Sequence, residues 1–203
     1  MSEFNITVEG GSSVKLPTAG KYCDRDIVVT ASGDQDIDTI NTLITTIGYT
    51  DVFESDVTSI RSYAFYDTAF KTIRLPRLTS IGSRCFYECR ELESIYIPNL
   101  EGLTGYDFRY CTSLTKIDLP KLKNVSSYSF HSCVGLKAII LRNETLCPLE
   151  NTNGFAGTPI ESGTGYVYVP SKLVDSYKSA TNWTAYSNQI RAIEDYPEIT
   201  LTE

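Results

Sequence analysis

Six apolar positions return in the same order every 21 or 22 residues through the middle of the chain, and this repeat limits the fold more than any other feature. One unit reads LTSIGSRCFYECRELESIYIP, and the next reads NLEGLTGYDFRYCTSLTKIDLP. The polar letters change between units while the apolar letters keep their places. The columns are Ile60, Ile81, Leu103, Val125; Phe65, Phe86, Phe108, Phe130; Thr68, Cys89, Cys111, Cys133; Phe70, Leu92, Leu114, Leu136; Ile73, Ile95, Ile117, Ile139; and Leu75, Ile97, Leu119, Leu141.

A period in the twenties with leucine-like columns is typical of a leucine-rich repeat. One unit is too small to bury its own apolar face, so neighbouring units stack and form a continuous core. The segment 92–97 alternates like a short strand, and its counterparts predict a parallel sheet with strands about 4.8 Å apart. Pro76, Pro98 and Pro120 end three of these strands, because proline cannot donate to a ladder, and Arg142 takes that place in the fourth unit. We therefore predict an α/β fold, a right-handed leucine-rich-repeat solenoid of four units over 57–142.

The pattern I-x-x-x-x-F-x-x-C-x-x-L-x-x-I-x-L-P resembles the BspA-type leucine-rich repeats of bacterial surface proteins, with a degenerate turn after residue 142. The family usually has a small residue before the phenylalanine, and here that place holds Ala64, Cys85, Asp107 and Ser129. Asp107 departs from the pattern. Because a buried carboxylate must find hydrogen bonds or reach water, we expect a local kink or a turn contact there.

The segments on either side of the repeats predict caps, since a stack of repeats has two open ends. From Tyr166 the tail resembles the closing segment that often follows such arrays. Val167 and Val169 alternate as a last strand, Pro170 starts a helix, and an apolar face follows on Leu173, Val174, Tyr177 and Trp183. We assign 143–203 to a degenerate repeat and this C-terminal cap.

The N-terminal part predicts two further units. Residues 1–32 read as short strands around the turn-forming letters PTAGKYCDRD, and this segment resembles parts of phage and prophage tail-associated proteins. In 33–56, apolar residues follow helical spacing between a capping aspartate and Gly48, which predicts a helical N-terminal cap; a separate helical linker is the alternative. The spaced residues are Ile37, Ile40, Leu43, Ile44 and Ile47.

Charge is unevenly distributed along the 203 residues. The net charge is −7 for 1–56, +5 for 57–142 and −5 for 143–203. The total of −7 argues against nucleic-acid binding. No run of apolar residues is long enough for membrane insertion, and the N-terminus lacks the basic and apolar regions of a secretory signal.

Little in the sequence points to catalysis, to a cofactor or to a metal. Three of the six cysteines, Cys89, Cys111 and Cys133, form one column of the repeat, which predicts free, buried, unreactive thiols; zinc is disfavoured because no CxxC motif occurs. His131 is the only histidine and falls in a mixed column with Tyr66, Tyr87 and Arg109, so we expect it at the surface. We predict that the chain is not an enzyme and takes no cofactor.

Two surfaces compete as the recognition face. Outward columns of the strand face include Arg74, Tyr96, Asp118, Ile140 and Thr72, Ser94, Lys116, Ala138, and we choose Arg74, Tyr96, Lys116 and Asp118 as the binding surface. The rival patch consists of Tyr63, Tyr66, Tyr87, Tyr106 and Tyr128. We interpret the chain as a non-enzymatic binding or adhesion module that acts at the cell surface or in secreted form. We expect its partner to be an acidic protein or glycan. The alternative is a receptor-binding or structural protein of a phage or prophage tail, located in the virion or the cytoplasm.

Overall fold

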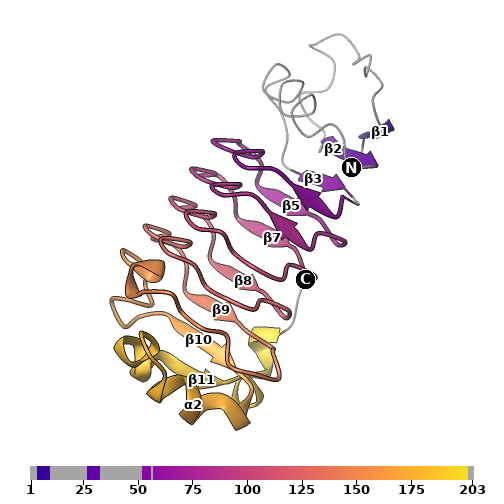
Figure 1. Cartoon of the computed structure of the whole chain (residues 1–203). Helices are drawn as coiled ribbons and strands as arrows, with labels where there is room; N and C mark the ends of the chain where they lie inside the picture. The colour runs from indigo at the N-terminus through magenta and orange to yellow at the C-terminus, as the bar shows by residue number, and fades with distance from the viewer. Residues whose placement is uncertain (1–3, 10–26, 33–51, 56, 201–203) are drawn as a thin grey trace.

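The structure is a computed structural model, and it describes residues 4–9, 27–32, 52–55 and 57–200, with side chains for residues 57–199. Short parallel strands follow one another along a stack of turns (Figure 1). The strands are β1 Phe4–Glu9, β2 Ile27–Ser32, β3 Val52–Ser55, β4 Ser59–Ile60, β5 Thr72–Arg74, β6 Ser80–Ile81, β7 Ser94–Tyr96, β8 Lys116–Asp118, β9 Ala138–Ile140, β10 Tyr166–Val169 and β11 Ile190–Ala192.

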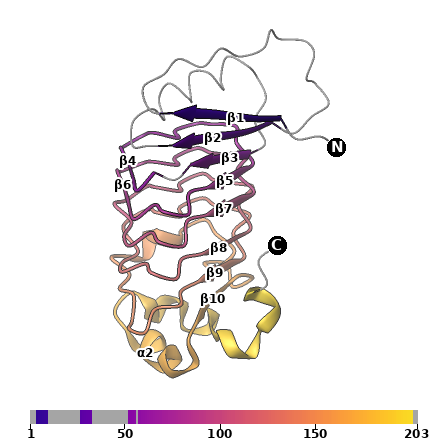
Figure 2. The same cartoon turned by 90° about the vertical axis from the view of Figure 1, so that its right-hand side faces the viewer.

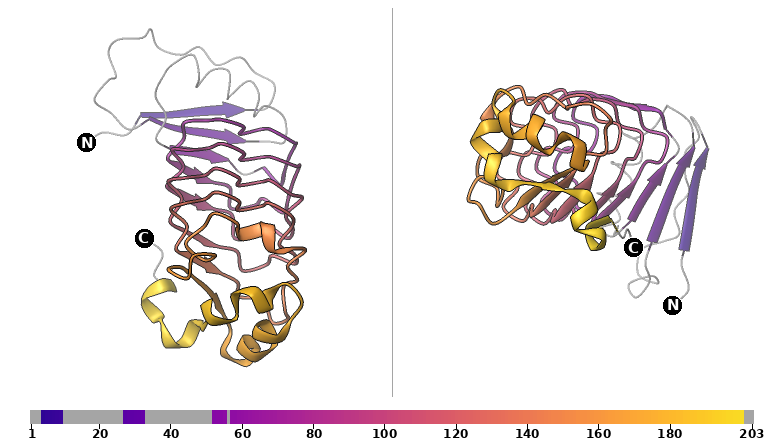
Figure 3. Two further views of the ribbon diagram at one scale, coloured as in Figure 1. Left: turned by 90° about the vertical axis from the view of Figure 1, so that its left-hand side faces the viewer. Right: turned by 90° about the horizontal axis from the view of Figure 1, so that it is seen from below.

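The strands form three parallel sheets. One sheet has the order β1-β2-β3-β5-β7, the second β11-β10-β9-β8, and β4 pairs with β6 on another side of the stack. Equivalent columns of the repeat lie opposite each other in the ladders, as in the pairs Ile73 with Ile95 and Ile117 with Ile139. Seen from the end of the stack, the main strands line one side and the turns the others (Figure 3). The leucine-rich-repeat fold with parallel strands that the repeat predicts is thus present.

The core is a ladder of phenylalanine rings that runs along the stack. Phe65, Phe86, Phe108 and Phe130 are fully buried, and neighbouring ring centroids lie 5.0–5.4 Å apart. Phe155 extends the ladder by one ring at 5.8 Å from Phe130, so a further ring of the core comes from beyond residue 142. Stacked rings of this kind gain packing energy beyond the area they bury.

Asp107 makes the turn contact that its place in the repeat predicts. Its carboxylate is buried and accepts hydrogen bonds from the backbone N–H groups of Thr104 and Gly105, at 2.8 and 2.9 Å, and from the Thr104 hydroxyl at 3.0 Å. Burial nevertheless raises the pKa of Asp107 to about 6, because the charged form loses its water. The carboxylate therefore closes this turn at an electrostatic cost.

The C-terminal part closes the stack with side chains from several short elements. The helix α2 spans Val174–Ser179, and the 3₁₀ segments are η1 Thr152–Phe155, η2 Ser171–Leu173, η3 Trp183–Gln189, η4 Ile193–Asp195 and η5 Pro197–Thr200. Tyr177 and Trp183 are fully buried, and both bond the backbone of Cys147 in the degenerate turn at 2.8 Å. Leu173 and Val174 are partly buried against the same core. The polar atoms of the two large rings are thus satisfied inside the cap.

Two details of the caps differ from the prediction. The strand β10, which contains Val167 and Val169, is followed by β11, which pairs with β10 in parallel and is the final strand of that sheet. In the range predicted as a helical cap, β3 pairs with β5, so its end belongs to the sheet of the repeats. The predicted helix over 37–47 lies outside the described residues. The two N-terminal strands are present as β1 and β2, paired in parallel.

Candidate binding groove

A groove opens on the strand face where one sheet ends and the next begins. β7 and β8 follow each other in the stack but belong to different sheets (Figure 1). The cavity between them has a volume of about 410 Å³. All four residues predicted for the binding surface line it, together with residues from the neighbouring edge positions. The lining residues are Arg74, Glu93, Ser94, Ile95, Tyr96, Pro98, Thr115, Lys116, Asp118 and Pro120.

The groove carries both charge and aromatic surface. The Arg74 guanidinium lies 5.2 Å from the centre of the Tyr96 ring, and Tyr96 is 42% exposed. Such a contact holds an exposed arginine and an exposed ring in a fixed mutual position. Lys116 adds a second cation from the next turn. One side of the groove thus presents two cations and an exposed ring.

Asp118 is held by an ion pair rather than left open to a ligand. Arg142 donates from Nε to both carboxylate oxygens, at 3.1 and 3.0 Å, and from Nη2 to Oδ2 at 2.7 Å. Arg142 occupies the place that proline holds in the other units. The sequence showed this replacement but not its use, because the partner lies 24 residues away along the chain. Asp118 thus shapes the groove, and its charge is largely neutralised.

The C-terminal segment 193–199 covers the strand face beside the groove. Ala138, Ile140 and Tyr168 are buried in a small separate cluster against Tyr166 and the C-terminal residues Ile193, Tyr196 and Ile199. Figure 2 shows this yellow segment on the strand side, beside β10. We predicted Ala138 and Ile140 to be exposed, and that expectation is wrong. Both residues are apolar, whereas the other residues of these outward columns are mostly polar. That difference was the signal in the sequence that another segment covers them.

The turns that precede β5, β7, β8 and β9 carry a network of rings and guanidinium groups, which we call the aromatic face. Tyr66 stacks on Tyr87 at 5.6 Å, and Tyr106 stacks on Tyr128 at 4.8 Å. Arg109 lies within 4.8–6.0 Å of four tyrosine ring centres, those of Tyr87, Tyr106, Tyr110 and Tyr128. Tyr63, Tyr66, Arg84, Tyr87, Tyr106, Arg109, Tyr110, Tyr128 and His131 make up the face.

This face is built on strained backbone. Tyr63, Arg84, Tyr106 and Tyr128 occupy one column with φ between 57° and 63°, the left-handed region that favours glycine. Each large side chain there costs roughly 1–2 kcal/mol. Bulky side chains thus stand at four positions of this column where glycine would be less strained.

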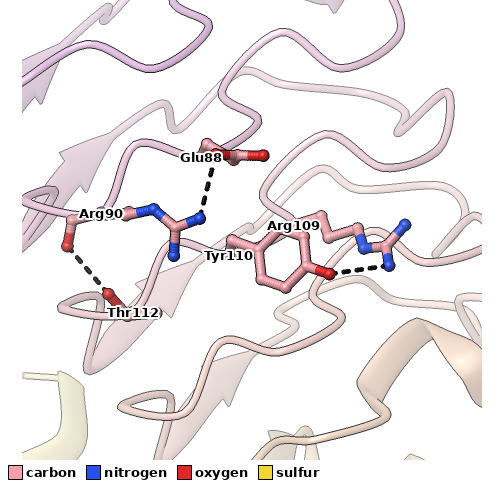
Figure 4. Close-up of polar contacts among 5 residues, drawn as sticks. All are labelled: Glu88, Arg90, Arg109, Tyr110 and Thr112. Carbon is pink, nitrogen blue, oxygen red and sulfur yellow. Dashed lines mark hydrogen bonds and ion pairs between the residues drawn. The ribbon is translucent and has the colours of Figure 1, made fainter.

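The two arginines drawn in Figure 4 differ in their partners. Arg90 pairs with Glu88 at 3.0 Å, and its backbone carbonyl accepts from the Thr112 hydroxyl. Arg109 donates from Nη2 to the Tyr110 hydroxyl at 3.0 Å (Figure 4). Its Nε atom is buried and has no hydrogen-bond partner among the residues that the structure describes.

His131 lies at the edge of the aromatic face and is partly exposed. Its ring centre is 5.4 Å from that of Tyr128, and its Nδ1 is 2.8 Å from the Ser132 hydroxyl. Partial burial and the nearby Arg109 charge lower the pKa of His131, because both disfavour the imidazolium. Glu161 acts in the opposite direction and favours the charged ring.

The cysteine column is buried and reduced. Cys89, Cys111 and Cys133 are free thiols that each donate to a backbone carbonyl of the preceding unit, those of Phe65, Phe86 and Phe108. Burial raises the pKa of Cys111. We expected the same of Cys89. Burial does act to raise its pKa, but side-chain interactions with Cys111 and Thr68 offset this, and the pKa of Cys89 is lowered.

Within the described ranges, histidine, cysteine, aspartate and glutamate side chains form no group of three or more that could hold a metal ion. In the same ranges, no helix has the length and apolar character that crossing a membrane requires.

Three comparisons relate the chain to known proteins. It is similar to the crystal structure of a leucine-rich repeat protein from Bacteroides ovatus, with 16% sequence identity and a TM-score of 0.45 over 83% of this chain and 54% of that one. The chain thus spans about half the length of that protein. No curated protein matches. These comparisons do not support the resemblance of the N-terminal segment to phage proteins, which stays a prediction.

The match to a family model covers residues 44–157, more than half of the chain, in six copies of the repeat. It begins before the four units that we counted and ends after them, in agreement with the pairing of β3 and the place of Phe155. The chain belongs to the family of BspA-type leucine-rich repeat proteins.

Proposed function

We propose that the chain is a non-enzymatic binding module, a solenoid that recognises a protein partner through the groove between β7 and β8. One observation carries the proposal: Arg74, Tyr96, Lys116 and Asp118, which come from three successive units, line one cavity. Side chains fixed on strands need little ordering on binding, so several weak contacts add without a large entropy cost. The repeat family to which the chain belongs favours a binding or adhesion role.

Tyr96 is the best candidate for an anchor. Its exposed ring supplies apolar area and a hydroxyl, and tyrosine and arginine are enriched among residues that dominate interface energies. Around it, Arg74 and Lys116 supply positive charge, while one of the two carboxylates, Asp118, is already paired with Arg142. An acidic partner complements this excess of positive charge in the groove. The net charge of +5 over 57–142 attracts such a partner from a distance.

The C-terminal segment supports a protein rather than a glycan as the partner. It places Ile193, Tyr196 and Ile199 on the outward side of β9 and β10, and carries Glu194 and Glu198 between them. The strand face thus already accommodates a peptide with apolar residues three apart and carboxylates between them. A partner segment of similar chemistry would extend along the open part of the same face.

We further propose that the protein acts at the bacterial cell surface or in secreted form, as the family resemblance implies. The alternative is a component of a phage or prophage tail. The neighbouring genes separate the two, because tail genes beside this one would favour the alternative, and an export signal in the complete gene would favour the surface.

A side-by-side screen tests the binding role. The wild-type chain and the variant Tyr96→Ala with Lys116→Glu are applied to the same arrays of bacterial and host proteins and of glycans. We expect at least one protein on the array to bind the wild type and not to bind the variant. If no protein binds, or if every protein binds both chains equally, the groove is not a recognition site. Binding confined to glycans would reject the protein partner.

A further inference from the structure

Arg109 on the aromatic face lacks an anion. Four tyrosine rings surround its guanidinium, and no carboxylate pairs with it among the residues that the structure describes. Its Nε is buried without a hydrogen-bond partner. Arg90, one unit earlier in the stack, shows the usual arrangement, because its charge is balanced by Glu88 (Figure 4). Arg109 thus combines a charge without a paired carboxylate with a buried Nε that has no hydrogen-bond partner among the described residues.

The groups around Arg109 are donors. The Tyr110 hydroxyl accepts from Arg109 and the Tyr128 hydroxyl accepts from the Asn153 amide, so both phenols keep their own O–H to donate. The Nη1 atom of Arg109 adds further N–H groups. Guanidinium and hydroxyl donors without a nearby anionic acceptor match an oxyanion, which accepts several charge-assisted hydrogen bonds at once.

A second cation lies one unit away. The Arg84 guanidinium is 4.6 Å from the centre of the Tyr106 ring, and Arg109 is 5.5 Å from the centre of the same ring. No carboxylate within the described ranges pairs with Arg84. Two like charges that share one ring repel each other, so an anion between or beside them relieves this repulsion. Two cations in neighbouring units, beside one ring, favour a ligand that carries more than one anionic group.

The aromatic rings narrow the class of ligand. Stacking of Tyr66 on Tyr87 and of Tyr106 on Tyr128 occupies ring faces that bases would need, which disfavours nucleic acid. An acidic peptide would need apolar pockets for its anchors, whereas these packed rings offer edges and hydroxyl groups. A polymer with many hydroxyl groups and regularly placed sulfates can hydrogen-bond to the phenol hydroxyls and pair with the guanidinium groups.

We propose that the aromatic face binds a sulfated glycan, with a sulfate group held by Arg109 and the hydroxyls of Tyr110 and Tyr128, and a second anionic group near Arg84. This site lies on a different face from the groove and is independent of the function proposed above.

A defined heparin hexasaccharide is the probe. Its affinity is measured by calorimetry at physiological salt for the wild type, Arg109→Gln, Tyr110→Phe and Lys123→Gln. Lys123 is the matched control, since it is an exposed cation of the same array that pairs with Glu101. We expect Arg109→Gln to weaken binding at least tenfold, Tyr110→Phe to weaken it several-fold, and Lys123→Gln to change it less than twofold. Arg109→Lys, which keeps the charge and the aliphatic stem, should bind with intermediate affinity, and melting temperatures check that each variant folds.

Three results would overturn the proposal. The wild type does not bind the hexasaccharide; Arg109→Gln and Lys123→Gln weaken binding equally, which would indicate general attraction of charge; or polyglutamate of equal charge binds as tightly, which would assign the face to an acidic peptide. His131 gives a local readout because it is the only histidine. An anion at Arg109 should raise the pKa of His131 in an NMR titration, and an unchanged value at saturation would place the ligand elsewhere.

Discussion

At the scale of single residues, the sequence showed which residues depart from the repeat better than it showed which groups those residues contact. Asp107 stood out because a carboxylate interrupts a column of small residues, and the need for hydrogen bonds followed from its burial. The donors, Thr104 and Gly105, lie within three residues and could be anticipated as a turn contact. The ion pair between Arg142 and Asp118 could not be anticipated, because its geometry depends on how adjacent units align in the stack.

Asp107 makes stability depend on pH. Its pKa is about 6 in the folded chain and near its ordinary value of 3.8 when unfolded, so the folded state holds a proton more tightly between these values. The free energy of unfolding therefore falls as pH rises from about 4 to about 6, by up to about 3 kcal/mol. Relative to wild type, Asp107→Asn should gain that amount over the same range, as measured by urea unfolding at several pH values. A difference between the two proteins that stays constant with pH would contradict this account.

The buried thiols should resist labelling. Cys85, Cys89, Cys111, Cys133 and Cys147 are free and buried, so a thiol reagent has no access to them until the chain unfolds. Mass spectrometry of labelled peptides checks this before and after addition of denaturant. Cys89 is the strictest case because its pKa is lowered. Labelling of the native cysteine column within minutes, or masses that show bridges within it, would refute the prediction.

At the scale of elements, periodicity predicted the strands and the ladder of rings, because both repeat with the sequence. The break between β7 and β8 was beyond prediction, since the columns continue unchanged across it. The covering of β9 and β10 by 193–199 was missed for another reason. That segment does not repeat, and its contacts join residues more than 50 positions apart, such as Ile140 and Ile193.

The ring ladder should be the main source of stability in the repeats. Phe108 is fully buried between Phe86 and Phe130, at 5.0 and 5.4 Å. Phe108→Ala leaves a cavity and should cost about 3–5 kcal/mol, measured by denaturant unfolding. Tyr66→Ala is the control, because Tyr66 also stacks on a ring of the next unit but is 45% exposed. Equal losses in the two variants would show that the ladder has no special role.

At the scale of the whole molecule, the repeats place two chemically different surfaces around one core, one on the strands and one on the turns. The strand face has a groove with cations and one exposed tyrosine, and the aromatic face has packed phenols with unbalanced guanidinium groups. From the sequence we chose the four residues of the strand face and, as the rival patch, the five tyrosines Tyr63, Tyr66, Tyr87, Tyr106 and Tyr128. The arginines between those rings were not part of the prediction. The sequence did not predict the groove itself, because a cavity depends on the local separation of strands. The right-handed sense of the stack stays a prediction.

The most direct test of the binding role uses a protein partner found in the array screen. Its dissociation constant is measured for the wild type, for Tyr96→Ala with Lys116→Glu, and for Tyr66→Ala with Tyr87→Ala on the aromatic face. We predict that the groove variant weakens binding tenfold or more, while its melting temperature stays unchanged and the aromatic-face variant binds normally. If the groove variant keeps full affinity and the aromatic-face variant loses it, recognition occurs on the aromatic face and the assignment of the groove is wrong.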